Sequence, residues 1–248
     1  MPKKRRRKPR VRYDRIAIVG IVLVLIIVLL SILLGSCSDD DVPVSTPEAA
    51  VFEPVVYLSP SNQNDNVYGN GETTEAEAMR NVSENVMKIL EQNGVEVHIA
   101  AEDDSLQDKV DFANKHKVTA HVAIHSNAGG ESGSGEGTEC YYNAEISESR
   151  ILAEYIYNRT SRLTPTPDRG MHDGTTGNSY LFEVANSTVP NCLIEVEFHD
   201  TVTLSNWIVT NTDNLAKSIA DGIMQYLDYE EEKFYEINTN ESSVIDGE

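Results

Sequence analysis

Residues 121–130 read HVAIHSNAGG, an apolar run that ends on a histidine and continues into small polar residues and two glycines. Short apolar runs bounded by turn residues are typical of buried strands. An ionisable imidazole such as that of His125 is unusual in the interior of a buried strand. We therefore expect this side chain at the tip of a strand, where a site can form.

The segments on both sides of this run alternate between strand-like and helix-like patterns. Strands are expected at residues 55–59, 95–100, 120–125, 137–143, 179–184 and 191–198, and helices at 74–93, 106–116, 151–163 and 215–227, with one more around Trp207. Thr74 opens the first helix, and Glu77 is placed to complete a capping box. Strands separated by helices predict an α/β fold, a single domain with a mostly parallel twisted sheet covered by helices on both faces. In such sheets the ligand site lies beyond the carboxyl ends of the strands.

Charge is distributed unevenly along the chain. Residues 1–15 hold nine of the 20 basic residues and one of the 40 acidic residues, so the remainder carries 11 basic and 39 acidic residues, a formal net charge of −28. A body this acidic is a poor binder of nucleic acid, because it cannot neutralise phosphates. No Gly-rich phosphate-binding loop follows a predicted strand. We expect neither a nucleic acid nor a nucleotide as partner.

Residues 16–36 form an apolar run long enough to cross a membrane as a helix. The basic segment 1–15 would then stay in the cytoplasm, which places the rest of the chain on the extracytoplasmic side of the cell membrane as a single-pass protein. A cleaved signal is the alternative, because residues 34–37, LGSC, resemble a bacterial lipobox with Cys37 as the lipid-modified residue. The length of the apolar run favours the uncleaved anchor.

Three further segments follow the apolar run. Residues 37–51 are acidic and contain prolines, which indicates a linker. Residues 52–229 are long enough for a domain with one core. Residues 230–248 are acidic and are expected to form a disordered tail.

Candidate ligands gather at one rim of the predicted sheet. The first strand ends in SPSNQ at residues 59–63, the third strand ends at His125, the last strand supplies Glu195 and His199, and a helix begins at Glu75. Carboxylates and imidazoles at such a rim suit a divalent metal, above all zinc. An acid in the first turn of a helix, such as Glu75, is also favoured by the helix dipole alone. Glu195 is harder to explain, because a carboxylate inside an apolar run is costly to bury unless it is paired, ligated or catalytic.

Four stretches are similar to motifs of a known family. They are VAIHSNAGG at residues 122–130, CLIEVEF at 192–198, DRGMH at 168–172 and FANK at 112–115. Through them residues 52–229 resemble the zinc-dependent N-acetylmuramoyl-L-alanine amidases, the type related to bacterial cell-wall autolysins and spore cortex amidases. The resemblance implies a peptidoglycan hydrolase that cuts the amide between the lactyl group of muramic acid and the L-alanine of the stem peptide. Together with the apolar run 16–36, it predicts a membrane-anchored enzyme.

The resemblance also implies roles for single residues. The family holds its zinc with His, Glu and His, and a separate Glu assists catalysis. Carried over to this chain, His125 is a histidine ligand and Glu75 is the acidic ligand, with Glu77 as an alternative two residues away. Glu195 is the catalytic carboxylate, which takes a proton from water and passes it to the leaving amine.

One position departs from the family pattern. Asn62 in SPSNQ stands where the first ligand histidine is expected, and an amide oxygen is a poorer zinc ligand than imidazole. Three explanations are open. Asn62 binds the metal weakly or through a water, His199 supplies the missing imidazole, or the site binds no metal. In the last case the protein is a non-catalytic peptidoglycan-binding or regulatory pseudoamidase. Two smaller departures are Glu197 in place of a glycine and Lys109 in place of an arginine.

Overall fold

The computed structural model describes residues 50–129 and 135–245, with side chains up to residue 238. The basic segment, the apolar run 16–36 and nearly all of the linker lie outside the described residues, so what the sequence predicts for them stays a prediction. Within the described part of the chain, no helix combines the length and the apolar character needed to span a membrane.

Six strands form one sheet in the order β2-β1-β3-β6-β4-β5. They are β1 Val55–Pro60, β2 Glu96–Ile99, β3 Ala120–Asn127, β4 Glu139–Tyr142, β5 Gly170–Asp173 and β6 Asn191–Phe198. Neighbouring strands pair in parallel, except that β4 is antiparallel to β6. The expected single α/β domain with a mostly parallel sheet is confirmed.

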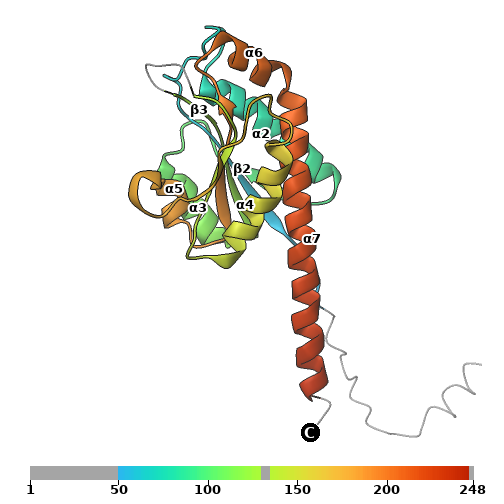
Figure 1. Ribbon diagram of the computed structural model, residues 1–248. Helices are drawn as coiled ribbons and strands as arrows, with labels where there is room; N and C mark the ends of the chain where they lie inside the picture. The colour runs from blue at the N-terminus through green and yellow to red at the C-terminus, as the bar shows by residue number, and fades with distance from the viewer. Residues whose placement is uncertain (1–49, 130–134, 246–248) are drawn as a thin grey trace, which may run out of the picture. The chain divides into compact units, whose positions relative to one another are not determined.

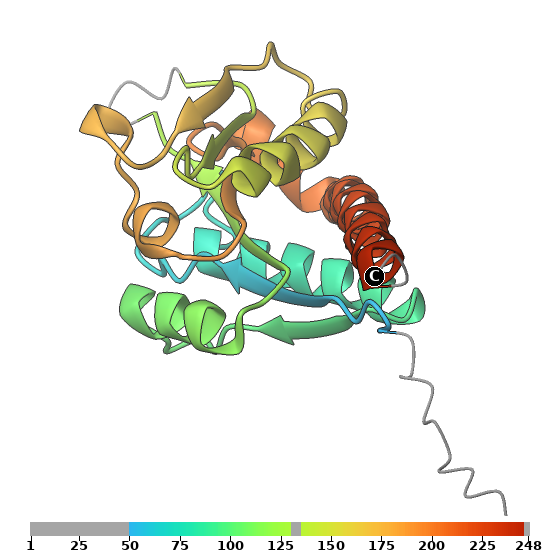
Figure 2. The same cartoon turned by 90° about the horizontal axis from the view of Figure 1, so that it is seen from below.

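Helices cover both faces of this sheet (Figures 1 and 2). The helical elements are α2 Glu75–Gln92, α3 Leu106–His116, α4 Ser147–Thr160, the short 3-10 turn η2 Gly177–Ser179, α5 Phe182–Asn186, α6 Val202–Thr210 and α7 Thr212–Ile245. One face packs against α2, α4 and α7, with α7 in contact with both α2 and α4, and the other face packs against α3 and α5.

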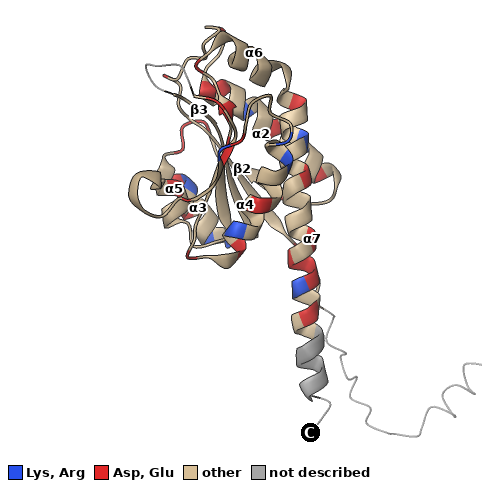
Figure 3. Cartoon of the chain, viewed as in Figure 1, with Lys and Arg blue, Asp and Glu red and all other residues tan. Residues whose placement is uncertain are grey.

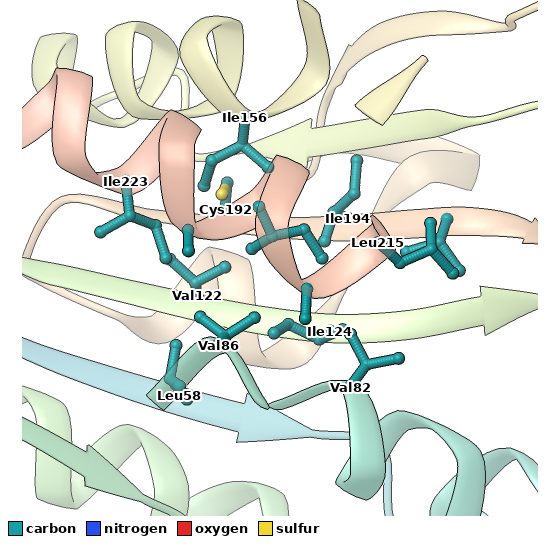
Figure 4. Close-up of a cluster of buried hydrophobic side chains, with 14 of the residues drawn as sticks. Leu58, Val82, Val86, Val122, Ile124, Ile156, Cys192, Ile194, Leu215 and Ile223 are labelled. Carbon is teal, nitrogen blue, oxygen red and sulfur yellow. The ribbon is translucent and has the colours of Figure 1, made fainter. Parts of the chain in front are cut away.

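The larger core lies between the sheet and the α2, α4 and α7 layer (Figure 4). Val122 and Ile124 of β3 point into it and meet Val82 and Val86 of α2, and all four side chains are fully buried. Because side chains alternate along a strand, this packing turns His125 toward the opposite face. The hydrophobic core therefore determines on which side of the sheet the imidazole lies.

The start of α2 differs from expectation in one detail. The Thr74 side chain accepts a hydrogen bond from the backbone N–H of Glu77, at 3.3 Å, as an N-cap should. The Glu77 carboxylate, however, accepts from the Thr73 hydroxyl, at 2.9 Å, instead of reaching back to the Thr74 backbone. The expected capping box is therefore incomplete, although the helix begins where the sequence predicts.

The segment 179–184, expected as a strand, contains the end of η2 and the start of α5. Short apolar runs fit a strand and a buried helical turn equally well, so periodicity cannot separate them. Here Glu183 and Val184 are buried in α5, and Glu183 pairs with His121 of β3 at 2.9 Å. Tertiary contact decides the conformation of this segment.

The C-terminal segment also differs from expectation. The sequence predicts a disordered tail from residue 230, but α7 continues to Ile245. Two contacts hold its extension: Lys233 Nζ lies 2.6 Å from Glu148 Oε1, and the Phe234 ring lies 5.7 Å from that of Phe52. Acidic composition indicated disorder, but it could not show that partners on α4 and the N-terminal side of the domain stabilise the helix.

Candidate active site

The candidate site forms where β3 and β6 end side by side. His125 of β3 is the register partner of Glu195 of β6, and the next paired residues are Asn127 and Phe198, so β6 carries one extra residue at this point. A β-bulge of this kind redirects side chains and is common beside functional sites. The parallel pairing thus brings two chemically active side chains, about 70 positions apart in sequence, to the same rim.

The third side chain of the site comes from the first turn of α2. Glu75 is 1% exposed, and its Oε1 lies 2.9 Å from Nδ1 of His125. The other carboxylate oxygen accepts a hydrogen bond from Asn66, at 2.8 Å. Glu77 is exposed and binds Thr73. Of the two candidate acids, the structure therefore places Glu75 beside His125.

A cavity of about 410 Å³ opens at this rim. Its lining consists of Asn62, Gln63, Leu106, His125, Leu181, Phe182, Glu183, Leu193 and Glu195. The size is within the range of small-molecule sites, and so is the combination of apolar walls with a few polar groups. His125 and Glu195 thus face a space that can hold part of a substrate.

Three buried polar atoms of the site lack a hydrogen-bond partner among the described residues. They are Glu75 Oε1, His125 Nε2 and Glu195 Oε2. The contact between Glu75 and His125 is short, but its geometry is that of an ion pair and not of an aligned hydrogen bond. Buried polar atoms are normally satisfied, so unpartnered ones at one rim indicate a group that binds there.

The surroundings shift the pKa of each of these groups. Burial raises the pKa of Glu195 to about 7; His125 lowers it, but Glu75 and Glu139 raise it further. Burial would also raise the pKa of Glu75, but contacts with His125 and Asn66 hold it below its usual value. Burial alone would lower the pKa of His125, yet Glu75 and Glu195 raise it. Two neighbouring carboxyls with pKa values moved in opposite directions suit different roles in acid–base chemistry.

The donor atoms at the rim fit a divalent cation in part. Glu75 Oε1 and His125 Nδ1 lie close enough to share one ion, and carboxylate plus imidazole is a ligand pair that zinc prefers. Catalytic zinc sites usually have three protein ligands. Within residues 50–129 and 135–245, however, no three side chains of His, Cys, Asp or Glu gather in a way that could hold a metal.

Asn62, predicted as a weak ligand, lines the same cavity as His125 and Glu195. Its Nδ2 donates a hydrogen bond of 2.9 Å to the backbone carbonyl of Asp104. The contact orients the amide and leaves only its oxygen available as a ligand. The structure therefore places Asn62 at the cavity, where its amide oxygen is the one side-chain atom left to bind a metal.

His199, the other candidate for the missing imidazole, has different partners. It is 3% exposed, its Nδ1 lies 2.9 Å from the Ser126 hydroxyl, and its ring stacks on Tyr68 with centroids 4.8 Å apart. The Tyr68 hydroxyl binds the same Ser126 oxygen, at 2.8 Å. These contacts engage Nδ1 of His199 and fix its ring; burial lowers the pKa of His199, and the nearby Glu75 raises it. A role of His199 as the missing ligand stays a prediction.

Two acidic residues at the site were missed by sequence reasoning. Glu139 of β4 pairs in register with Glu195 and is 4% exposed. Glu183 lines the cavity and pairs with the buried His121. The available signal was a charged or ionisable residue inside an apolar strand-like run, as in ECYY, and the spacing of His121 four residues before His125, which places both on one face.

Comparisons with known proteins give matches over most of the domain. A family model described as N-acetylmuramoyl-L-alanine amidase matches residues 61–225. An uncharacterized cell wall amidase of Bacillus anthracis is 37% identical over 105 residues, which cover 39% of this chain and only 18% of that protein. The uncharacterized protein YqiI of Bacillus subtilis (strain 168) is 29% identical over 163 residues, covering 61% of this chain and 75% of that protein.

Solved structures share the fold. The catalytic domain of CwlV, an N-acetylmuramoyl-L-alanine amidase from Bacillus (Paenibacillus) polymyxa var. colistinus, is 27% identical with a TM-score of 0.62, covering 71% of this chain and 98% of that one. An N-acetylmuramoyl-L-alanine amidase from Clostridium difficile 630 is 24% identical with a TM-score of 0.63, covering 71% of this chain and 97% of that one. The second likeness shows the fold alone.

Proposed function

The chain belongs to the N-acetylmuramoyl-L-alanine amidase family, and from this premise we propose that it hydrolyses the amide between the lactyl group of muramic acid and L-alanine in peptidoglycan. The observation that carries the proposal is Glu195, a partly buried carboxyl with a pKa raised to about 7, beside the Glu75–His125 pair at a cavity. A general acid–base group works best when its pKa lies near the working pH.

Glu195 can exchange one proton in both directions near pH 7. As carboxylate it takes a proton from the attacking water, and as carboxylic acid it gives that proton to the leaving amine of L-alanine. The apolar walls of the cavity, which include Leu181 and Leu193, lower the polarity around this exchange. Glu195 thus carries the proton through both steps.

We also propose that Glu75 and His125 hold a zinc ion, because their donor atoms lie 2.9 Å apart without an aligned hydrogen bond. When bound, the ion would supply Lewis-acid polarisation of the scissile carbonyl. Asn62, whose amide is oriented by Asp104, is a candidate to support the ion from the same cavity.

The proposed place of action is the outer face of the cell membrane. The support is the uncharged run within residues 16–36 and the basic segment before it. Protease added to intact protoplasts should digest the domain, and membrane pellets should retain the full chain. Recovery of the domain in the cytoplasm, protected from protease, would contradict this placement.

A second candidate function is a non-catalytic peptidoglycan-binding module. One reason for it is that Asn62 stands at the position of a ligand histidine. Another is that no three side chains of His, Cys, Asp or Glu gather to hold a metal within the described residues. Such a protein would bind wall fragments in the same cavity without cleaving them.

One experiment separates the two functions. The purified protein, prepared without chelator, is analysed for zinc and incubated with purified cell wall, and newly exposed L-alanine amino groups are counted. The amidase predicts about one zinc per chain and amine release that Glu195→Gln reduces by a factor of about 10² to 10⁴. Wall binding without amine release, with or without added zinc, would establish the binding module instead.

A further inference from the structure

A buried carboxylate lies beside Glu195 on the side away from His125. Glu139 of β4 is the antiparallel register partner of Glu195 and is 4% exposed. Register partners in adjacent antiparallel strands lie side by side on one face of a sheet. Whatever Glu139 holds is therefore close to the proposed catalytic carboxyl.

Glu139 holds three side chains. Its Oε1 accepts a hydrogen bond from Asn127, Arg169 Nε lies 3.2 Å from its Oε2, and His172 Nε2 lies 3.4 Å from the same oxygen. β5 pairs with β4 in parallel, which brings the segment carrying Arg169 and His172 alongside. The sequence motif DRGMH thus places an arginine against Glu139, the register partner of Glu195.

Contacts fix the backbone and the guanidinium of Arg169, but much of its side chain is exposed to solvent. The backbone N–H of Arg169 donates to the carbonyl of Thr138 at 2.8 Å, and the guanidinium lies over the Phe198 ring, 5.2 Å from its centroid. The side chain is nevertheless 46% exposed. Nε is the nitrogen that pairs with Glu139, and no hydrogen bond from the two terminal nitrogens is found among the described residues. A guanidinium oriented in this way keeps its planar pair of donors free for a carboxylate.

The charge around the site is negative, so an anionic ligand needs a cation such as Arg169 to bind there. Glu75, Glu139 and Glu195 all lie at the rim, and acidic residues are spread along α2 and α7 (Figure 3). A carboxylate approaching Glu195 would be repelled by this field unless a fixed positive group received it.

We propose that Arg169, oriented by Glu139 and Phe198, binds a carboxylate of the substrate beside Glu195 and so makes the site selective for stem peptides with free rather than amidated carboxyl groups. The inference rests on the proposed function, because it takes a peptidoglycan stem peptide as the ligand. Arg169 acts here as a specificity residue, and proton transfer stays with Glu195.

A purely structural role for Arg169 would consist in neutralising Glu139. That role predicts lower stability on substitution and an equal loss of affinity for every ligand. Recognition of a carboxylate predicts instead a loss confined to the charged ligand. The two roles therefore differ in selectivity, which can be measured directly.

The test is equilibrium binding by calorimetry with the full-length protein in detergent, carrying Glu195→Gln so that no ligand is cleaved. The probes are N-acetylmuramoyl-L-alanyl-D-glutamate and its diamide, which differ only in whether the two glutamate carboxyl groups are free or amidated. The parent should bind the free acid about tenfold more tightly than the diamide, as expected for a charge-assisted hydrogen-bonded pair. Arg169→Gln should abolish this preference, and Arg169→Lys should keep part of it. Arg162→Gln is the matched control, since Arg162 lines a separate hollow near α7 and should leave the preference unchanged.

Equal affinity of the parent for both probes would overturn the inference, and this result does not depend on how any Arg169 variant folds. An equal loss for both probes in a folded Arg169→Gln variant would also overturn it. A different result would reject the proposed function alone. If the protein prefers the free acid but releases no amine from cell wall, the role of Arg169 is supported and the amidase activity is rejected.

Discussion

Replacing Glu195 by Gln is expected to stabilise the metal-free protein at pH 8 while removing the proposed amidase activity. Glu195 Oε2 is buried without a hydrogen-bond partner among the described residues, and the pKa of the carboxyl is raised from its usual 4.5 to about 7. Burial and the neighbouring carboxylates Glu75 and Glu139 disfavour the charged form. A charge held in an unfavourable environment is a known stability cost of active sites.

The magnitude follows from the two pKa values. The folded protein binds the Glu195 proton more tightly than the unfolded chain does, so this contribution to stability is fully present below about pH 4.5 and is lost as the pH rises through about 7. The complete loss corresponds to about 3 kcal/mol. Because Glu195 is partly exposed, solvent screening reduces the expected value to about 2 kcal/mol. Glutamine carries no charge and removes the cost.

The assay is urea unfolding of parent and variant at pH 8 and pH 5, with chelator present. Glu195→Gln should unfold at higher urea concentration than the parent at pH 8, with a difference that shrinks at pH 5. Glu197→Gln is the control on the same strand: Glu197 is fully buried and accepts from the backbone N–H groups of Gly137 and Phe198, at 2.7 and 2.8 Å. Its loss should cost about 1–3 kcal/mol at both pH values.

The reasoning is refuted if Glu195→Gln is no more stable than the parent at pH 8. It is equally refuted if the gain is the same at pH 5, because a pH-independent gain would come from packing and not from the charge.

Three further predictions concern other contacts of the domain. Glu75→Gln should weaken zinc binding at least tenfold in a chelator competition, whereas the exposed Glu77→Gln should leave it unchanged; equal losses would contradict the choice of Glu75 as ligand. Glu183→Ala should lower the free energy of unfolding by about 3–5 kcal/mol, because it removes the carboxylate 2.9 Å from Nε2 of the buried His121 and leaves Ser187 as the partner of Nδ1; a loss under 1 kcal/mol in urea unfolding would argue against this pair. Lys233→Ala should cost at most about 1 kcal/mol and increase hydrogen exchange in the last turns of α7, since Lys233 Nζ contacts Glu148 at 2.6 Å at a half-exposed position; unchanged exchange would show that this ion pair does not stabilise the helix extension.

The sequence predicted the parts of the fold that depend on local periodicity. The helix at 106–116 and the strand at 191–198 have the bounds expected, and β3 continues two residues beyond its expected end. His125 and Glu195 were identified as residues of a strand-end site because an ionisable side chain in an apolar run is unusual. Their register pairing agrees with that expectation.

The sequence could not decide between candidate ligands that lie close together in the chain. Glu75 and Glu77 both lie in the first turn of one helix, and only the packing of α2 on the sheet turns Glu75 toward His125. His199 had the residue type of a ligand, but its place was decided by Ser126 and Tyr68, partners distant in sequence.

By itself, the sequence determined the α/β alternation and the rim where the candidate site lies, because apolar periodicity and turn residues act over short spans of chain. Only the tertiary structure decided which acid meets His125, that residues 182–186 form a helix, and that Arg169 reaches the surroundings of Glu195 through Glu139. These outcomes depend on strand order and register, which join segments far apart in the chain. A side chain's partners, and with them its pKa and role, exist only once those segments have met.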